Sequence, residues 1–145
     1  MIDSYSITSQ TVASNGIVTF AINDIKTCNS ITHTSGTGAF GINRPGYYKV
    51  DFSCSGAISG DTAANITVQL YNNSTAVPGA TATFYSAAAT NVGNLSFSKI
   101  IYIPPSCCAI NNRGNLTIQN TGAEAIFTNV NIAISRLNRG GNSCA

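Results

Sequence analysis

The chain has 145 residues, and only 8% of them are charged, against roughly 25% in typical soluble domains. Its seven Lys and Arg residues are scattered rather than grouped into a basic run or stripe, which argues against nucleic-acid binding. No segment approaches the ~20 consecutive apolar residues of a membrane-spanning helix. We therefore expect one domain with a polar, weakly charged surface and no nucleic-acid or membrane partner.

Along the chain, short segments rich in β-branched and aromatic residues alternate with clusters of Gly, Asn, Ser and Pro. The predicted strands cover residues 17–22, 31–34, 39–42, 47–57, 66–71, 81–85, 94–103, 114–120 and 126–137. About eight to ten short strands at this spacing are typical of an all-β fold, an antiparallel β-sandwich or jelly roll. Residues 1–15 are expected to form an N-terminal arm, residues 16–137 the domain and residues 138–145 a flexible tail.

The clearest local pattern is a Pro-Gly turn at Pro45-Gly46, followed by an alternating strand. That strand places Tyr48, Val50, Phe52 and Cys54 on one face. Alternation also predicts the outward faces of two later strands. In the strand at residues 66–71, Tyr71 is expected to point outward. In the strand at residues 126–137, Phe127 is expected to point outward, because the inward face is shared by Ile126, Thr128, Val130, Ile132 and Ile134.

Five cysteines occur, at Cys28, Cys54, Cys107, Cys108 and Cys144, and none has the C-x-x-C spacing of a zinc site. We interpret them as reduced thiols, with Cys54 a small core residue. Late oxidation after release from the cell, with Cys144 linking chains, stays open as the alternative.

Residues that carry catalysis are sparse. The acids Asp3, Asp24, Asp51, Asp61 and Glu124 show no spacing that would pair two carboxylates on one strand face. The single histidine, His33, is interpreted as an exposed strand residue rather than a general base. The sequence therefore predicts no enzyme, and no catalytic, metal or cofactor site.

Residues 38–52 contain Gly-x-Phe, a short gap, Pro-Gly-x-Tyr and then an alternating aromatic strand. This order resembles the core signature of the tumour-necrosis-factor-like superfamily, which includes the complement globular heads. Residues 66–73 and 128–137 are similar to its next strand and its closing strand, and residues 68–71 and 76–82 look more like its bacterial and phage members. The signature positions are filled by Phe40, Pro45, Gly46, Tyr48 and Phe52.

The resemblance implies a TNF-like jelly roll of ten strands that assembles as a homotrimer. Tyr71 and Phe127 are then candidates for the trimer interface, because both are expected to point outward. The superfamily's calcium-binding acids have no evident counterparts here, so the resemblance implies no metal.

The composition suits an exposed surface protein, yet residues 1–6 lack the positive and apolar regions of a secretory signal. A phage protein reconciles the two, because it is made in the host cytoplasm and released by lysis. We therefore expect a capsid decoration or head-fibre protein on the virion surface, bound to the major capsid protein or another virion component. The anchor would be the N-terminal arm or residues 136–145.

Two alternatives stay open. One is a bacterial spore-surface protein of the exosporium type, which is also built without a signal peptide. The other is a carbohydrate-binding adhesin or receptor-binding tip that recognises a host-surface glycan. Its aromatic candidates are Tyr71, Tyr85 and Tyr102.

Overall fold

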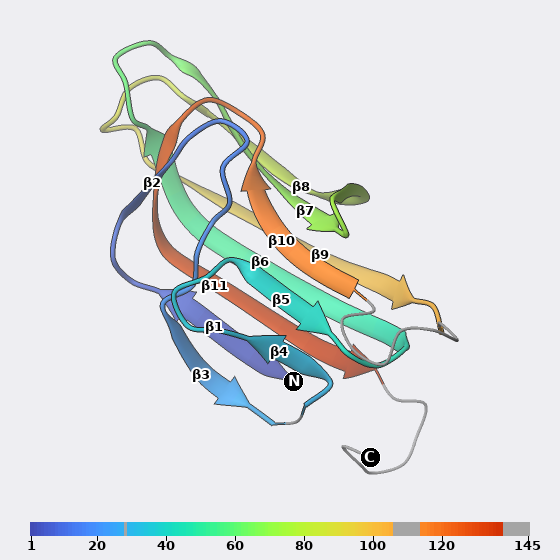
Figure 1. The fold of residues 1–145 in the computed structure, drawn as a ribbon. Coiled ribbons are helices and arrows are strands. Elements are labelled where there is room, and N and C mark those ends of the chain that lie inside the picture. The colour runs from blue at the N-terminus through green and yellow to red at the C-terminus, as the bar shows by residue number, and fades with distance from the viewer. Residues whose placement is uncertain (28, 106–113, 138–145) are drawn as a thin grey trace.

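The structure, a computed structural model, describes residues 1–27, 29–105 and 114–137. These ranges form two antiparallel β-sheets that pack face to face as a sandwich (Figure 1). Nowhere in them is there a helix long and apolar enough to span a bilayer. The expected all-β jelly-roll class is confirmed.

Sheet A has the strand order β3-β1-β11-β6-β9, and β2 also pairs with β11. Its strands are β1 (Ile2–Ser6), β2 (Gln10–Val12), β3 (Ile22–Lys26), β6 (Gly46–Ile58), β9 (Gly93–Ile103) and β11 (Ala125–Leu137). Sheet B has the order β4-β5-β10-β7-β8. Its strands are β4 (Ile31–His33), β5 (Ala39–Ile42), β7 (Ala64–Asn72), β8 (Thr75–Ser86) and β10 (Gly114–Asn120).

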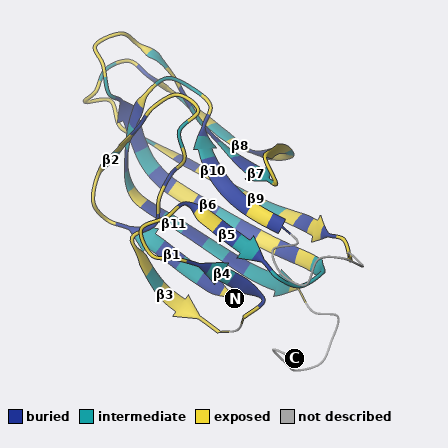
Figure 2. Ribbon diagram, in the orientation of Figure 1, coloured by how far each residue is buried: buried dark blue, intermediate teal, exposed yellow. Residues whose placement is uncertain are grey.

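The core lies between the sheets, where every second residue of each long strand points inward (Figure 2). Phe20, Phe40 and Tyr48 are fully buried, and Phe52 is 3% exposed. Phe20 packs edge-to-face on Phe40 and Phe52 with ring centroids 5.2 and 6.5 Å apart, and Phe52 stacks on Phe97 at 5.4 Å. Burial of a large apolar side chain contributes about 1.5–3 kcal/mol, so this aromatic cluster is a main source of stability.

The expected N-terminal arm is wrong for residues 2–6, because they form strand β1 in the interior of sheet A, between β3 and β11. Ile2, Ser4 and Ser6 alternate as its buried positions. Ser4 Oγ donates to Asn23 Oδ1 at 2.7 Å, while Ser6 Oγ accepts from the Ala21 amide at 2.7 Å. Because hydrogen bonds satisfy these hydroxyls, serine fills core positions, and the apolar alternation of a strand is absent from the sequence.

The strand expected at residues 17–22 lies later, as β3. Val18 and Phe20 are buried as expected. Ile17, however, forms only an isolated bridge to Gln119 of β10, and Phe20 one to Thr37, which lies between β4 and β5. Ile22, expected beside them, is 43% exposed at the start of β3. The segment thus crosses from one sheet to the other instead of running along one of them.

Strand β11 carries a β-bulge that exchanges its two faces. Its register with β6 shifts between Thr128 and Asn131, and Asn129 takes the left-handed φ of 50°. After the bulge Val130 is buried, whereas before it the buried residue is Phe127. The single face expected from residue 126 to residue 134 is therefore wrong on the N-terminal side of the bulge.

Candidate interaction surfaces

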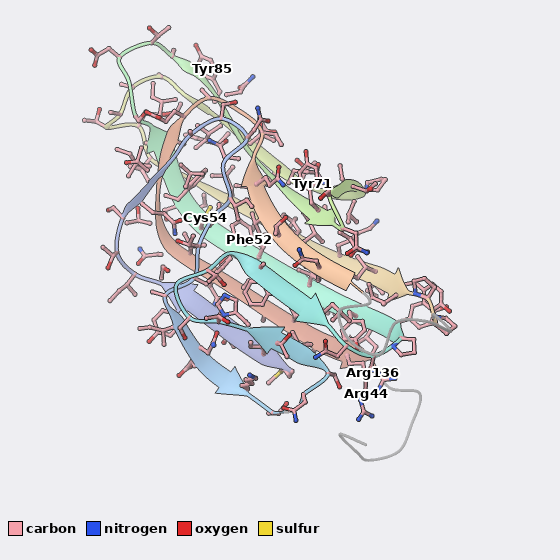
Figure 3. The ribbon with its side chains drawn as sticks, in the orientation of Figure 1. Arg44, Phe52, Cys54, Tyr71, Tyr85 and Arg136 are labelled. Carbon is pink, nitrogen blue, oxygen red and sulfur yellow. The ribbon has the colours of Figure 1, made fainter. Side chains whose placement is uncertain are left out.

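The Pro-Gly turn is held by side chains from two strands. Tyr48 Oη donates to the Arg44 carbonyl at 2.8 Å, and Arg136 Nη2 donates to the Pro45 carbonyl at 2.8 Å. Gly46 has φ of 139°, and a Cβ there would lie 3.2 Å from Arg136 Nε. Figure 3 shows Arg44 and Arg136 at the end of the sandwich where β6 begins and β11 ends. The signature residues therefore shape the turn as well as the core.

Directly beyond this turn, the outer face of sheet A carries four exposed apolar side chains. Cross-strand pairing joins Tyr47 to Tyr102 of β9 and to Leu137 of β11, and Ile100 lies two residues from Tyr102 on the same face. The exposed fractions are 56% for Tyr47, 55% for Ile100, 52% for Tyr102 and 40% for Leu137. The two tyrosine rings lie 4.9 Å apart. We call these four residues the aromatic patch.

The same face becomes polar beyond the aromatic patch. A shallow depression of about 320 Å³ is lined by Asp51, Phe52, Ser53, Ser96, Phe97, Ser98 and Asn131. A hydrogen bond from Ser98 lowers the pKa of Asp51; burial opposes this effect without reversing it, and Lys49 at 3.1 Å lowers the pKa further. This strip offers hydroxyls, amides and one carboxylate, with no nucleophile–base pair among its described residues.

The two predicted trimer-interface residues are placed differently. Phe127 is fully buried between the sheets, so the expectation that it contacts a neighbouring chain is wrong. The bulge in β11 exchanges the two faces of the strand and turns Phe127 inward. Tyr71 is half-buried and lies on the outer face of sheet B, paired with Thr117 of β10 (Figure 3). Its role between chains stays a prediction.

The predicted glycan-binding aromatics do not cluster. Tyr85 is 62% exposed and pairs with Asn65, on the outer face of sheet B but at the other end of β7 from Tyr71. Tyr102 belongs to the aromatic patch on sheet A. An aromatic platform made from all three is therefore wrong for a single chain.

His33 is 7% exposed, so its interpretation as an exposed strand residue is wrong. Its ring stacks on Phe40 with centroids 4.1 Å apart, Nε2 donates to the Thr37 carbonyl at 3.0 Å, and Nδ1 lies against the Asn23 side chain. Burial lowers the pKa of His33, and the bond to Thr37 opposes this effect without reversing it. The contact with Asn23 could not be read from the local sequence, because Asn23 lies in sheet A and His33 in sheet B.

Cys54 is a core residue, as predicted, with 4% of its surface exposed. Burial raises the pKa of its thiol to about 12. The neutral thiol therefore prevails near pH 7 and reacts slowly. Cys28, Cys107, Cys108 and Cys144 lie outside the described residues.

Two of the acidic residues accept hydrogen bonds from neutral side chains. Asp3 accepts a hydrogen bond from Asn131 Nδ2 at 2.7 Å, and Glu124 Oε1 accepts one from Ser59 Oγ at 2.6 Å. In the part of the chain that the structure describes, no three His, Cys, Asp or Glu side chains are grouped to hold a metal ion.

The strand order, the buried signature and the Pro-Gly turn define a TNF-like jelly-roll fold. No protein-family model and no curated protein sequence matches the chain.

Solved structures do match, at low identity. Eiger TNF from S. frugiperda matches with a TM-score of 0.67 and 14% identity over 97% of this chain and 95% of that one. Murine APRIL at pH 5.0 matches with a TM-score of 0.64 and 6% identity over 94% of this chain and 98% of that one. PRD1 vertex protein P5 matches with a TM-score of 0.56 and 12% identity over 94% of this chain and 96% of that one. At these identities the likeness shows the fold alone.

Proposed function

We propose that the protein is a homotrimeric structural protein of a phage particle, displayed on the capsid as a decoration or head-fibre protein. Three observations support this role. The fold is shared with the phage PRD1 vertex protein P5, the surface is weakly charged, and the aromatic patch is suited to contact between copies. The partners would be further copies of the chain and the major capsid protein or another virion component.

The aromatic patch is the observation that carries self-association. Monomeric proteins rarely leave several large apolar side chains exposed side by side, and such patches mark interfaces. Tyr47 and Tyr102 bury well at interfaces, because each ring gives a large apolar area while its hydroxyl stays hydrogen-bonded. In a closed ring of three copies, the patch of each copy would be covered by a neighbouring copy, and closure of the ring prevents growth into a fibre. We therefore assign the interface to this patch on sheet A rather than to Tyr71.

Light scattering of the purified protein tests the assembly. We expect a mass of three times the 15.0 kDa chain. The double variant Tyr47→Ser, Tyr102→Ser should shift the mass toward one chain, because it removes the two largest apolar groups of the patch. Tyr85→Ser is the matched control, since Tyr85 is equally exposed on the other sheet. A wild-type monomer, or equal dissociation of the control, would refute the assignment.

Attachment to the particle is tested separately. Because β1 is part of sheet A, the remaining proposed anchor is residues 136–145, of which residues 138–145 lie outside the described residues. Immunogold labelling of purified particles should place the protein on the capsid surface. A chain ending at Leu137 should keep its assembly state and no longer co-sediment with the particles. Undiminished co-sedimentation would exclude the tail as anchor, and unlabelled capsids would exclude the virion role.

A further inference from the structure

The two sheets differ sharply in charge. None of the five strands of sheet B contains Asp, Glu, Lys or Arg. The strands of sheet A contain Asp3, Asp24, Lys26, Lys49, Asp51, Lys99 and Arg136. His33 is the one histidine of sheet B, and burial lowers its pKa and so favours the neutral ring. Near pH 7 the strands of sheet B are thus free of side-chain charge.

The outer face of sheet B is built from hydroxyl and amide side chains. One cross-strand row runs from Gln119 through Gln69 to Thr81. A second row pairs Thr67 with Thr83, and the hydroxyl oxygens of these two threonines lie 3.0 Å apart. Such groups both donate and accept hydrogen bonds. Because its strands lack charged side chains, this face presents a neutral hydrogen-bonding surface.

One part of this face is hollowed. A depression of about 330 Å³ lies over β4, β5 and the start of β10, and its lining is Thr32, His33, Thr34, Ala39, Gly41 and Asn115. His33 is itself buried, and Lys26 of β3 is the charged group that acts on it. The small residues Ala39 and Gly41 lie side by side with Thr117 and Asn115 in the cross-strand register. The hollow therefore has a floor of small residues and a rim of hydroxyl and amide groups.

Tyr71 lies outside the lining of this depression, on the same face of sheet B and one strand beyond β10. Thr117 pairs with Ala39 on one side and with Tyr71 on the other, so about two strand spacings, near 10 Å, separate Tyr71 from Ala39. Thr117 points outward between two fully buried neighbours yet is only 8% exposed, so the side chains around it cover it. A half-buried tyrosine thus lies on the same face as the hollow, two strand spacings from its residue Ala39.

We infer that this part of sheet B binds a neutral carbohydrate. A sugar ring offers an apolar C–H face that packs on an aromatic ring, together with hydroxyls that need donors and acceptors. Tyr71 supplies the ring, and Thr32, Thr34 and Asn115 supply the polar groups. An acidic sugar would find no Lys or Arg on these strands, and burying an unpaired charge is costly. The site lies on the sheet that the proposed assembly leaves free, but it does not depend on that assembly.

The test uses the purified full chain on an array of neutral oligosaccharides built from glucose, galactose, mannose and N-acetylhexosamines. Sialylated and sulfated glycans on the same array serve as charged comparators. We expect binding to at least one neutral glycan. Raising NaCl from 0.05 to 0.5 M should change the affinity less than about twofold, because salt screens charges and this contact has none.

Two variants and one control locate the site. Tyr71→Ala should weaken binding at least about tenfold, and Ala39→Arg should abolish it, since Ala39 is exposed and a long side chain there fills the hollow. Tyr85→Ala, at the far end of the same face, should bind as wild type. Light scattering of each variant should match wild type, which separates this result from a failure of the proposed assembly.

Four outcomes would overturn the inference. They are binding to no glycan, binding only to acidic glycans, undiminished binding by both site variants, and loss of the wild-type mass in Tyr71→Ala. The last would instead support the sequence-based prediction that Tyr71 packs between chains.

Discussion

At the residue scale, buried polar side chains hold this sandwich together as specifically as its apolar core does. Asn120 is fully buried where β10 ends. Its Nδ2 donates to the Val12 carbonyl at 3.0 Å and to the Ala123 carbonyl at 2.7 Å, and its Oδ1 accepts from the Gly122 amide at 3.1 Å. One side chain thereby ties the N-terminal segment to the turn that precedes β11.

We predict that Asn120→Ala lowers the free energy of unfolding by about 2–4 kcal/mol, because it leaves buried carbonyl and amide groups without partners. Urea titration followed by circular dichroism measures the change. Asn94→Ala is the control: Asn94 is exposed and accepts only an exposed bond from Ser55, so its loss should cost below about 0.5 kcal/mol. An equal loss of unfolding free energy in the two variants would contradict the idea that the buried hydrogen bonds of Asn120 stabilise the fold.

His33 gives the fold a dependence on pH. Its pKa is lowered in the folded state from an ordinary value of 6.5, so the unfolded chain takes up the proton first as the pH falls. Stability is therefore full above about pH 6.5 and declines as the pH drops through the lower folded-state pKa. The nearby Lys26 acts in the same direction, because it also disfavours a charged ring.

We expect the urea midpoint of the wild type to fall between pH 7.5 and pH 5, and that of His33→Gln to fall less. Glutamine retains an N–H donor for the Thr37 carbonyl but does not titrate. Asp51 does not confuse the comparison, because its pKa lies below 3.8. Parallel pH profiles for the two proteins would show that His33 is not the titrating group.

At the element scale, the strands with uninterrupted apolar alternation were predictable. The strand after the Pro-Gly turn lies within β6, and its buried residues Tyr48, Val50 and Phe52 are the predicted ones. Strand β1 was not predictable. Its buried hydroxyls bind partners far along the chain: Ser4 donates to Asn23, 19 residues away, and Ser6 donates to the Thr19 carbonyl, 13 residues away. Alternation along one segment cannot reveal a partner that distant in the chain.

The candidate sites were less predictable than the strands. The aromatic patch joins Tyr47, Tyr102 and Leu137, which are far apart in the sequence and meet only through the strand register. Phe127 was misplaced because one extra residue in β11 exchanges the faces of the strand. A site formed by strand pairing, and a bulge opposite a distant partner, are both properties of the assembled sheet.

The bulge in β11 allows a direct test. Asn129 is exposed and has φ of 50°, a conformation that asparagine and glycine tolerate and β-branched residues do not. We predict that Asn129→Val costs about 1–2 kcal/mol of stability and that Asn129→Gly stays within about 0.5 kcal/mol of wild type. Thermal unfolding measures both. Equal stability of the valine and glycine variants would mean that the backbone there does not require a left-handed residue.

At the scale of the whole molecule, the fold is held together with little help from charge. Only 8% of the residues are charged, and the Lys49–Asp51 pair has side chains 46% and 42% exposed. An ion pair that open to water contributes little, and salt screens it further. The apolar core and buried hydrogen bonds respond weakly to ionic strength, so stability should be nearly independent of dilute salt.

We therefore predict that the melting temperature changes by less than about 3 °C between 0.02 and 0.3 M NaCl, measured by scanning calorimetry at pH 7.5. A surface ion pair contributes at most about 1 kcal/mol, which corresponds to a few degrees in a domain of this size. The same scan on Lys49→Ser, which removes the pair, should show the same small dependence. A larger shift in the wild type that disappears in Lys49→Ser would show that this pair carries real stability.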